Sequence, residues 1–127
     1  MRFIPTRVHG VLDYLVGVLL IFAPRIFGFQ NGGPEDRIPV ILGVITIVYS
    51  LLTRYELGAF KLIPFRIHLT LDFISGVFLA ISPWLFGFSE RVWVPHVVVG
   101  ILEIGAALMT HRTPIEEPHV TSGKMHA

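Results

Sequence analysis

The chain has 127 residues, of which 53% are hydrophobic and only 15% are charged, and its mean hydropathy is +0.69. A water-soluble domain has about a quarter charged residues, so the excess apolar surface is expected to face lipid or a large partner. The net charge is +1 and the basic residues are scattered, which excludes the basic stripe of a nucleic-acid-binding surface. The absence of cysteine excludes disulfides and thiolate metal sites.

Four apolar stretches follow one another along the chain, at about residues 8–23, 38–53, 67–82 and 92–110. Each is somewhat shorter than the ~20 residues of an average membrane-spanning helix. The second stretch nevertheless lacks the charged face of an amphipathic surface helix. The first stretch has no small-residue cleavage site after it, so we interpret it as a retained helix rather than a signal peptide. The sequence therefore predicts an all-α integral membrane protein with four transmembrane helices.

The first and third stretches are copies of one another. The segment RVHGVLDYLVGVLLIFAPRIFGF at 7–29 aligns without gaps with RIHLTLDFISGVFLAISPWLFGF at 66–88. Beyond the following loop the similarity resumes weakly, with Gly43 matching Gly100 and Thr53 matching Thr110. The repeated unit is thus two helices long. Because each unit has an even number of helices, a tandem duplication gives a parallel pseudo-twofold repeat.

Lys and Arg residues are distributed unevenly between the two sides that four crossings imply. One side has Arg2, Arg7, Arg54, Lys61, Arg66, Arg112 and Lys124, and the other has Arg25, Arg37 and Arg91. This excess predicts a multi-pass protein of the inner (cytoplasmic) membrane with both termini cytoplasmic. We expect one membrane domain at 1–112, with repeats at about 7–55 and 66–112, and a mobile cytosolic tail at 113–127.

A proline followed by aromatic residues and a glycine occurs late in each copy of the first helix. We expect the proline to end or kink the helix, Ser82 to cap a short new turn, and the glycine to allow the backbone to turn. The aromatic side chains would lie at the membrane–water boundary. This predicted interfacial wedge consists of Pro24, Phe27, Phe29, Pro83, Trp84, Phe86 and Phe88.

The duplicated helix–proline–aromatic–glycine pattern, with the triplet Ser82-Pro83-Trp84 in its second copy, resembles the SPW-repeat family of bacterial membrane proteins. The resemblance covers roughly residues 7–112, although the first copy reads Ala23-Pro24-Arg25 in place of the triplet. It implies an integral membrane domain of two repeats, and it supplies no catalytic residues. Its markers are the matched pairs His9/His68, Asp13/Asp72, Gly17/Gly76 and Pro24/Pro83.

Three acidic residues, Asp13, Asp72 and Glu103, interrupt the apolar stretches. Ionisable side chains at membrane depth are costly and mark functional sites by default. With a helical rise of 1.5 Å per residue, the two aspartates lie ~9 Å and Glu103 ~13 Å from flanking arginines on the cytoplasmic side. All three are therefore expected in the same half of the bilayer.

Each aspartate belongs to a stripe of residues spaced four apart, which share one helix face. The stripes are His9–Asp13–Gly17 and His68–Asp72–Gly76. The glycine at the inner end of each stripe would let another helix approach closely. We therefore expect both stripes to face the interior of the bundle.

The resulting candidate cluster comprises His9, Asp13, His68, Asp72 and Glu103. In one interpretation its members are structural and pair with each other, with neighbouring helices or with arginines. In the alternative, they form an ion- or proton-handling site, or bind a transition metal such as Zn²⁺. A membrane-embedded metalloenzyme is a third interpretation that the same ligands permit.

No nucleophile–base pair, Walker loop or dinucleotide fingerprint occurs in the sequence, so we predict no catalytic residues and no cofactor. We expect a structural or accessory membrane component that packs against a second copy of itself or a larger membrane complex. Its remaining partner is the lipid bilayer.

Overall fold

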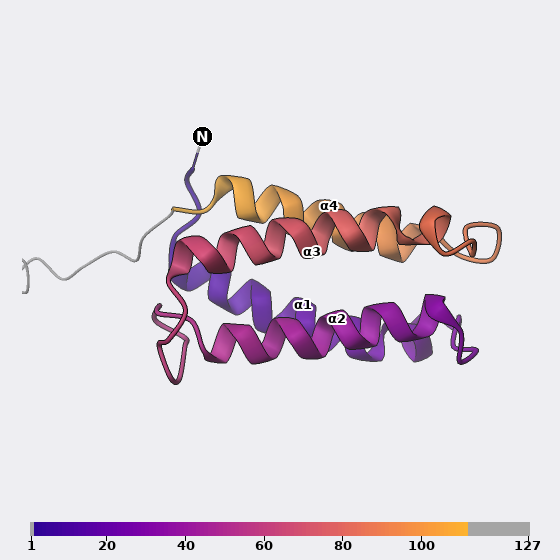
Figure 1. Cartoon of the computed structure of the whole chain (residues 1–127), viewed down its shortest axis with the longest axis horizontal. Coiled ribbons are helices and arrows are strands. Elements are labelled where there is room, and N and C mark those ends of the chain that lie inside the picture. The colour runs from indigo at the N-terminus through magenta and orange to yellow at the C-terminus, as the bar shows by residue number, and fades with distance from the viewer. Residues whose placement is uncertain (1, 112–127) are drawn as a thin grey trace, which may run out of the picture.

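The computed structural model describes residues 2–111, which form four helices (Figure 1). Helix α1 spans Thr6–Ile26, α2 spans Pro34–Leu51, α3 spans Phe65–Leu85 and α4 spans Val94–Met109. The N-terminal segment, the α2–α3 connection and the end of α4 lie at one end of the bundle, and the two short turns lie at the other. The predicted all-α, four-helix architecture is confirmed. The tail predicted at 113–127 lies outside the described residues.

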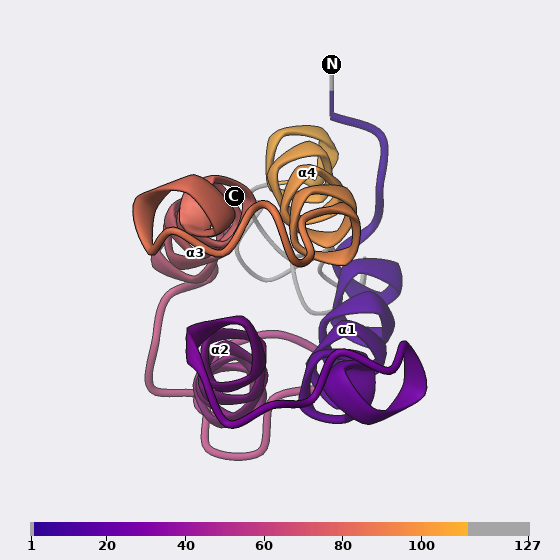
Figure 2. The same cartoon turned by 90° about the vertical axis from the view of Figure 1, so that its right-hand side faces the viewer.

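Viewed along the helices, the bundle consists of two helical hairpins that face each other (Figure 2). Helix α1 packs mainly on α2, and α3 packs mainly on α4, while α1 and α4 barely touch. Each hairpin corresponds to one copy of the repeat. Helices α1 and α3, which carry the two His–Asp stripes, lie diagonally opposite across the bundle.

Glycines allow the two helices of each hairpin to come into backbone contact. A Cβ atom on Gly43 would lie 2.6 Å from the carbonyl oxygen of Gly17, and one on Gly100 would lie 2.6 Å from that of Gly76. Both distances are too short for any side chain. The stripe glycines therefore do admit a neighbouring helix, and that helix is the partner within the same repeat.

The expectation that Pro24 and Pro83 end their helices is wrong. Helix α1 continues through Pro24 to Ile26, and α3 continues through Pro83 to Leu85. The helices end at glycines of positive φ, Gly28 and Gly87, both at 74°. The N–H of the residue after each glycine bonds back to the proline carbonyl, which is a Schellman ending. Glycine ends the helix because it alone adopts this conformation without strain.

Ser82 does not cap a new turn; its hydroxyl donates a hydrogen bond to a backbone carbonyl within α3. Proline lacks an N–H, so Pro83 cannot bond to the carbonyl of Leu79, one turn earlier. The hydroxyl of Ser82 donates to that carbonyl instead, at 2.7 Å. Both Ser82 and Leu79 are fully buried, where an unbonded carbonyl would be costly. The serine thus compensates for the proline that follows it.

Large apolar side chains cover the outside of the bundle, among them Phe22, Val44, Ile74 and Ile101, each about half exposed. Helices α1 and α3, with 21 residues each, are long and apolar enough to cross a membrane, and most of the apolar segment of each is not buried within the bundle. Helix α4 is apolar but shorter. The first turn of α2 contains the charged residues Glu35 and Asp36, so the apolar part of α2 is shorter than the helix itself.

Candidate functional site

The two His–Asp stripes meet in the interior of the bundle, near the end that holds the N-terminal segment and the α2–α3 connection, and pair across it. His9 Nε2 on α1 lies 2.6 Å from Asp72 Oδ2 on α3, and His68 Nε2 lies 2.7 Å from Asp13 Oδ2. Within each helix, the histidine Nε2 is also 3.1 Å from the aspartate of its own stripe. All four side chains are at least nine-tenths buried. Each histidine therefore bridges both carboxylates, and the cluster joins the two repeats.

Threonines at matched positions of the repeat hold the other nitrogen of each imidazole. Thr110 Oγ1 lies 2.8 Å from His9 Nδ1, and Thr53 Oγ1 lies 2.7 Å from His68 Nδ1. Each threonine hydroxyl gives its only proton to the backbone carbonyl four residues earlier, at 2.6 Å. The hydroxyl can then only accept from the imidazole. Both Nδ1 atoms therefore carry a proton.

This tautomer determines the charge of the cluster. Because Nδ1 is protonated, a neutral imidazole would turn the lone pair of Nε2 toward a carboxylate oxygen at 2.6 or 2.7 Å. Such contact between two acceptors is repulsive, so a proton lies between each Nε2 and its cross-helix carboxylate. Besides the two protons on the Nδ1 atoms, the four side chains therefore share two protons between Nε2 and carboxylate. With these protons included, the four side chains have no net charge.

Two tyrosine hydroxyls donate further hydrogen bonds to the carboxylates. Tyr49 on α2 donates to Asp72 Oδ1, and Tyr55 in the α2–α3 connection donates to Asp13 Oδ2 at 3.2 Å. Burial and the negative charge of Asp13 raise the pKa of Tyr55, so this phenol stays protonated and can donate.

A sequence model of the SPW repeat domain matches residues 7–110. The chain belongs to the SPW repeat family. No curated protein and no solved structure matches it. In this SPW repeat protein, Pro83 of the triplet leaves the Leu79 carbonyl without its helical N–H partner, and Ser82 donates a hydrogen bond to that carbonyl. Trp84, the third residue of the triplet, is exposed.

The pseudo-twofold symmetry of this SPW repeat protein breaks beside the cluster. Where the first repeat has Thr46 and Tyr49, the second has Glu103 and Ala106 at the matched positions of α4. The missing phenol ring leaves a cavity of about 310 Å³, whose lining includes Ala106 and Glu103. The same cavity reaches His9, Asp13 and Asp72. The asymmetry therefore opens one side of the cluster, between α1 and α4.

Glu103 lines this cavity without joining the hydrogen bonds of the cluster. Its side chain is 7% exposed, and Oε1 has no hydrogen-bond partner among residues 2–111. Of the five residues predicted to form the site, four are therefore brought into direct contact, and Glu103 lies beside them.

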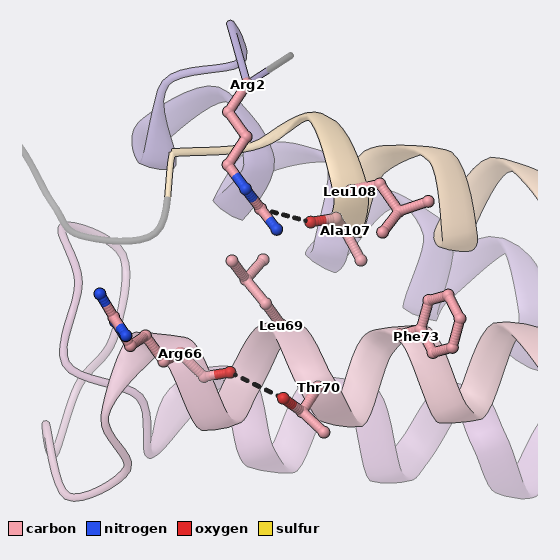
Figure 3. A pocket seen from close by; sticks show the side chains of 7 residues that line it. All are labelled: Arg2, Arg66, Leu69, Thr70, Phe73, Ala107 and Leu108. Atoms are coloured by element: carbon pink, nitrogen blue, oxygen red, sulfur yellow. Dashed lines mark hydrogen bonds between the residues drawn. The ribbon is translucent and has the colours of Figure 1, made fainter.

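A second hollow, of about 380 Å³, lies between α3 and α4 near the end that holds the N-terminal segment (Figure 3). Arg2 and Arg66 stand at its polar end, and Leu69, Phe73 and Leu108 line its apolar part. The guanidinium of Arg2 donates to the carbonyls of Ala107 and Thr110 at 3.0 and 2.7 Å. This hollow includes none of the cluster residues in its lining.

The predicted wedge residues lie at the opposite end of the bundle, but they do not form one uniform surface. Phe27, Trp84 and Phe86 are exposed, whereas Pro24, Pro83 and Phe88 are buried and Phe29 is half-buried. The rings of Phe29 and Phe88 instead pack on the buried imidazole of His96, at 5.2 and 4.9 Å between centroids.

The sequence analysis matched Thr53 with Thr110 without giving them a role, and it missed the residues that join the repeats at the wedge end. Thr53 and Thr110 were detectable as a matched pair, because they recur at equivalent positions of the repeat. The ion pair at the wedge end, in which Arg91 donates to Glu35 at 2.5 and 3.2 Å, had no local signal. Its two residues have no matched counterparts.

Proposed function

We propose that this protein is a structural or accessory component of the bacterial inner membrane, without catalytic activity. Its four helices would all lie in the bilayer with both termini cytoplasmic. The observation that carries the proposal is the cluster itself, in which the polar side chains of His9, Asp13, His68 and Asp72 find their partners within the bundle. Such internal pairing joins the two repeats where lipid offers no hydrogen bonds.

Membrane insertion is supported by the outward-facing apolar side chains. The core helix of a soluble protein is mostly buried, whereas only 39% of the apolar segment of α1, and the same share of α3, is buried within the bundle. The expected protein stays in the membrane pellet on carbonate washing and needs detergent for extraction. Complete release by carbonate alone would contradict insertion.

The orientation can be tested on the native background, because the chain has no cysteine. Lys61 lies in the α2–α3 connection and Glu90 lies in the α3–α4 turn, so the single-cysteine variants Lys61→Cys and Glu90→Cys report on the two sides. We expect an impermeant thiol reagent added to intact cells to label the Glu90→Cys variant only, and inverted vesicles to give the reverse. Labelling of both variants from one side would exclude four crossings.

The catalytic alternative is disfavoured by the hydroxyl nearest the cluster. Thr110, His9 and Asp72 follow one another in a hydroxyl–imidazole–carboxylate order. The proton of that hydroxyl is donated to the carbonyl of Ala106, however, so the imidazole is the donor in its contact with the threonine. Thr110 is also fully buried. A nucleophile needs the opposite proton arrangement and access to substrate.

An accessory role predicts a defined assembly larger than the single chain of 14.2 kDa. After solubilisation in several mild detergents, light scattering or native mass spectrometry should find a fixed stoichiometry with a second copy or another membrane protein. A lone monomer in every detergent would contradict this role.

A second candidate function, ion or proton handling, is favoured by the cavity that reaches Asp13, Asp72 and Glu103. In liposomes, Asp13→Asn with Asp72→Asn should then abolish a flux that the wild-type protein supports. Asp36→Asn, outside the cavity lining, is the matched control. Equal flux in wild type and the double variant would exclude this function.

A further inference from the structure

The buried His–Asp cluster has the donor set and the geometry of a metal site. His9, Asp13, His68 and Asp72 each offer one ligand atom, and the four atoms all lie within 4.8 Å of one another. We propose that these four residues bind one divalent transition-metal ion, with Zn²⁺ the best match. This inference goes beyond the accessory role proposed above and does not depend on it.

The distances show how the ligand atoms would rearrange around an ion. Zn²⁺ binds imidazole nitrogen at about 2.0–2.1 Å and carboxylate oxygen at about 2.0–2.2 Å, which in a tetrahedron separates the ligand atoms by roughly 3.3 Å. The nitrogen–oxygen contacts of the cluster range from 2.6 to 3.1 Å, and one ligand atom from each residue can be chosen so that all four lie within 4.8 Å of one another. An ion would therefore move the contacting atoms apart by a few tenths of an ångström and draw the more distant ligand atoms together.

The surroundings of the ligands are those of a metal-binding histidine pair. A ligating imidazole usually donates its other N–H to an oxygen, which fixes the tautomer and the ring orientation. Here Thr110 and Thr53 accept from the Nδ1 atoms, and this leaves both Nε2 atoms directed at the centre. Tyr49 likewise donates to the outer oxygen of Asp72.

Charge also favours a divalent ion over a monovalent one. Two neutral imidazoles and two carboxylates around one divalent ion make a site with no net charge. This balance avoids the cost of burying a net charge. Imidazole ligands further select Zn²⁺ or a neighbouring transition metal over Mg²⁺ or Ca²⁺.

The cavity beside the cluster gives an ion access to the site, and Glu103 in its lining is a second, independent feature that points to a bound ligand. The cavity of about 310 Å³ where Ala106 replaces a tyrosine opens beside three of the four ligands. Glu103 lines it with Oε1 buried and unpartnered among the described residues. A buried carboxylate oxygen without a donor is suited to a passing cation. With all four positions filled by protein, the site is of the closed, structural type and would fasten the two repeats together.

The test uses the full-length chain purified in detergent without chelators. Zn²⁺ is titrated in competition with a chromophoric chelator, and Co²⁺ serves as a spectroscopic probe because its tetrahedral complexes have strong visible bands. We expect one Zn²⁺ per chain, a tetrahedral Co²⁺ spectrum and no competition by Mg²⁺. Failure of the wild-type protein to bind one Zn²⁺ per chain, or an octahedral Co²⁺ spectrum, would overturn the proposal.

Variants separate this site from adventitious binding. Asp13→Asn with Asp72→Asn should weaken Zn²⁺ binding by more than the about 10- to 100-fold that the loss of an outer partner costs. Thr53→Val keeps all four ligands and should weaken it by about 10- to 100-fold. His96→Gln, which changes a buried histidine outside the cluster, is the matched control and should bind as wild type does.

Histidines of the C-terminal region are removed in a separate variant, with His111, His119 and His126 each changed to Ala. This variant should keep the site at full stoichiometry. Loss of Zn²⁺ binding in this variant, or equal affinity in the Thr53→Val and His96→Gln variants, would show adventitious binding and refute the proposal.

Discussion

The hydrogen bond of Ser82 can be tested for its proposed role, which is to replace the backbone hydrogen bond that Pro83 cannot make. Ser82→Ala removes the hydroxyl that donates to the Leu79 carbonyl at 2.7 Å. Pro83→Ala restores a backbone N–H that can bond to the same carbonyl as in any helix. If the serine serves to replace the missing N–H, its removal should matter only while the proline is present.

The magnitude follows from the burial of both groups, which are fully inaccessible. A hydrogen bond of this kind contributes about 1 kcal/mol net, and interhelical polar contacts in membranes average about 0.6 kcal/mol. We expect Ser82→Ala to cost about 1 kcal/mol with Pro83 present and about zero in the Pro83→Ala background, so that the coupling is about 1 kcal/mol.

The assay is reversible unfolding in mixed detergent micelles, monitored by helical circular dichroism for all four members of the cycle. Trp84→Phe, at the exposed third position of the triplet, is a control that should show no coupling with Ser82→Ala. An equal cost of Ser82→Ala in both backgrounds would refute the reasoning, because the hydroxyl would then act independently of the proline.

Three further predictions concern helix packing, the cluster and the wedge end. Gly100→Ala should destabilise the fold by about 1–3 kcal/mol, because its Cβ would meet an α3 backbone oxygen at 2.6 Å, whereas Gly105→Ala, with open space around it, should be neutral or stabilising; equal unfolding midpoints would contradict this. Tyr49→Phe deprives a buried carboxylate of a donor and should cost about 1–3 kcal/mol; an unchanged melting temperature in detergent would argue against that bond. Glu35 lies on the first turn of α2, ahead of the apolar stretch, and hydrogen bonds from Arg91 lower its pKa from 4.5 to about 2. Because the folded-state pKa is the lower one, the stabilisation is present above pH 4.5 and is lost as the pH falls toward 2. The melting-temperature difference between wild type and Arg91→Gln should therefore shrink over that range, and a constant difference would refute the assignment.

Much of the site was predictable because its signals are local and periodic. Histidine, aspartate and glycine spaced four apart necessarily share a helix face, and the exact recurrence of the stripe in the second copy indicated that both stripes face inward. The aspartates are indeed buried between the helices, 7% and 2% exposed. The glycines of both stripes also contact a neighbouring helix, as their size suggested.

The ends of the helices were predicted less well, for a reason visible at Pro24 and Pro83. Proline was expected to end the helix because it removes a hydrogen bond in the helix interior. Near the last turn that loss is small, and the glycine that follows supplies a stronger ending through its positive φ. In α3, Ser82 also repairs the lost bond.

The sequence by itself determined the helices, their duplication and the class of surface they present, because these depend on residue type and on spacing along one segment. Only the tertiary structure decided that His9 pairs with Asp72 across the bundle, and that threonines from the other repeat set the tautomer. It also decided that Ala106 leaves a cavity beside the cluster. These features depend on distances between side chains far apart in the chain, and the packing of the two hairpins sets those distances.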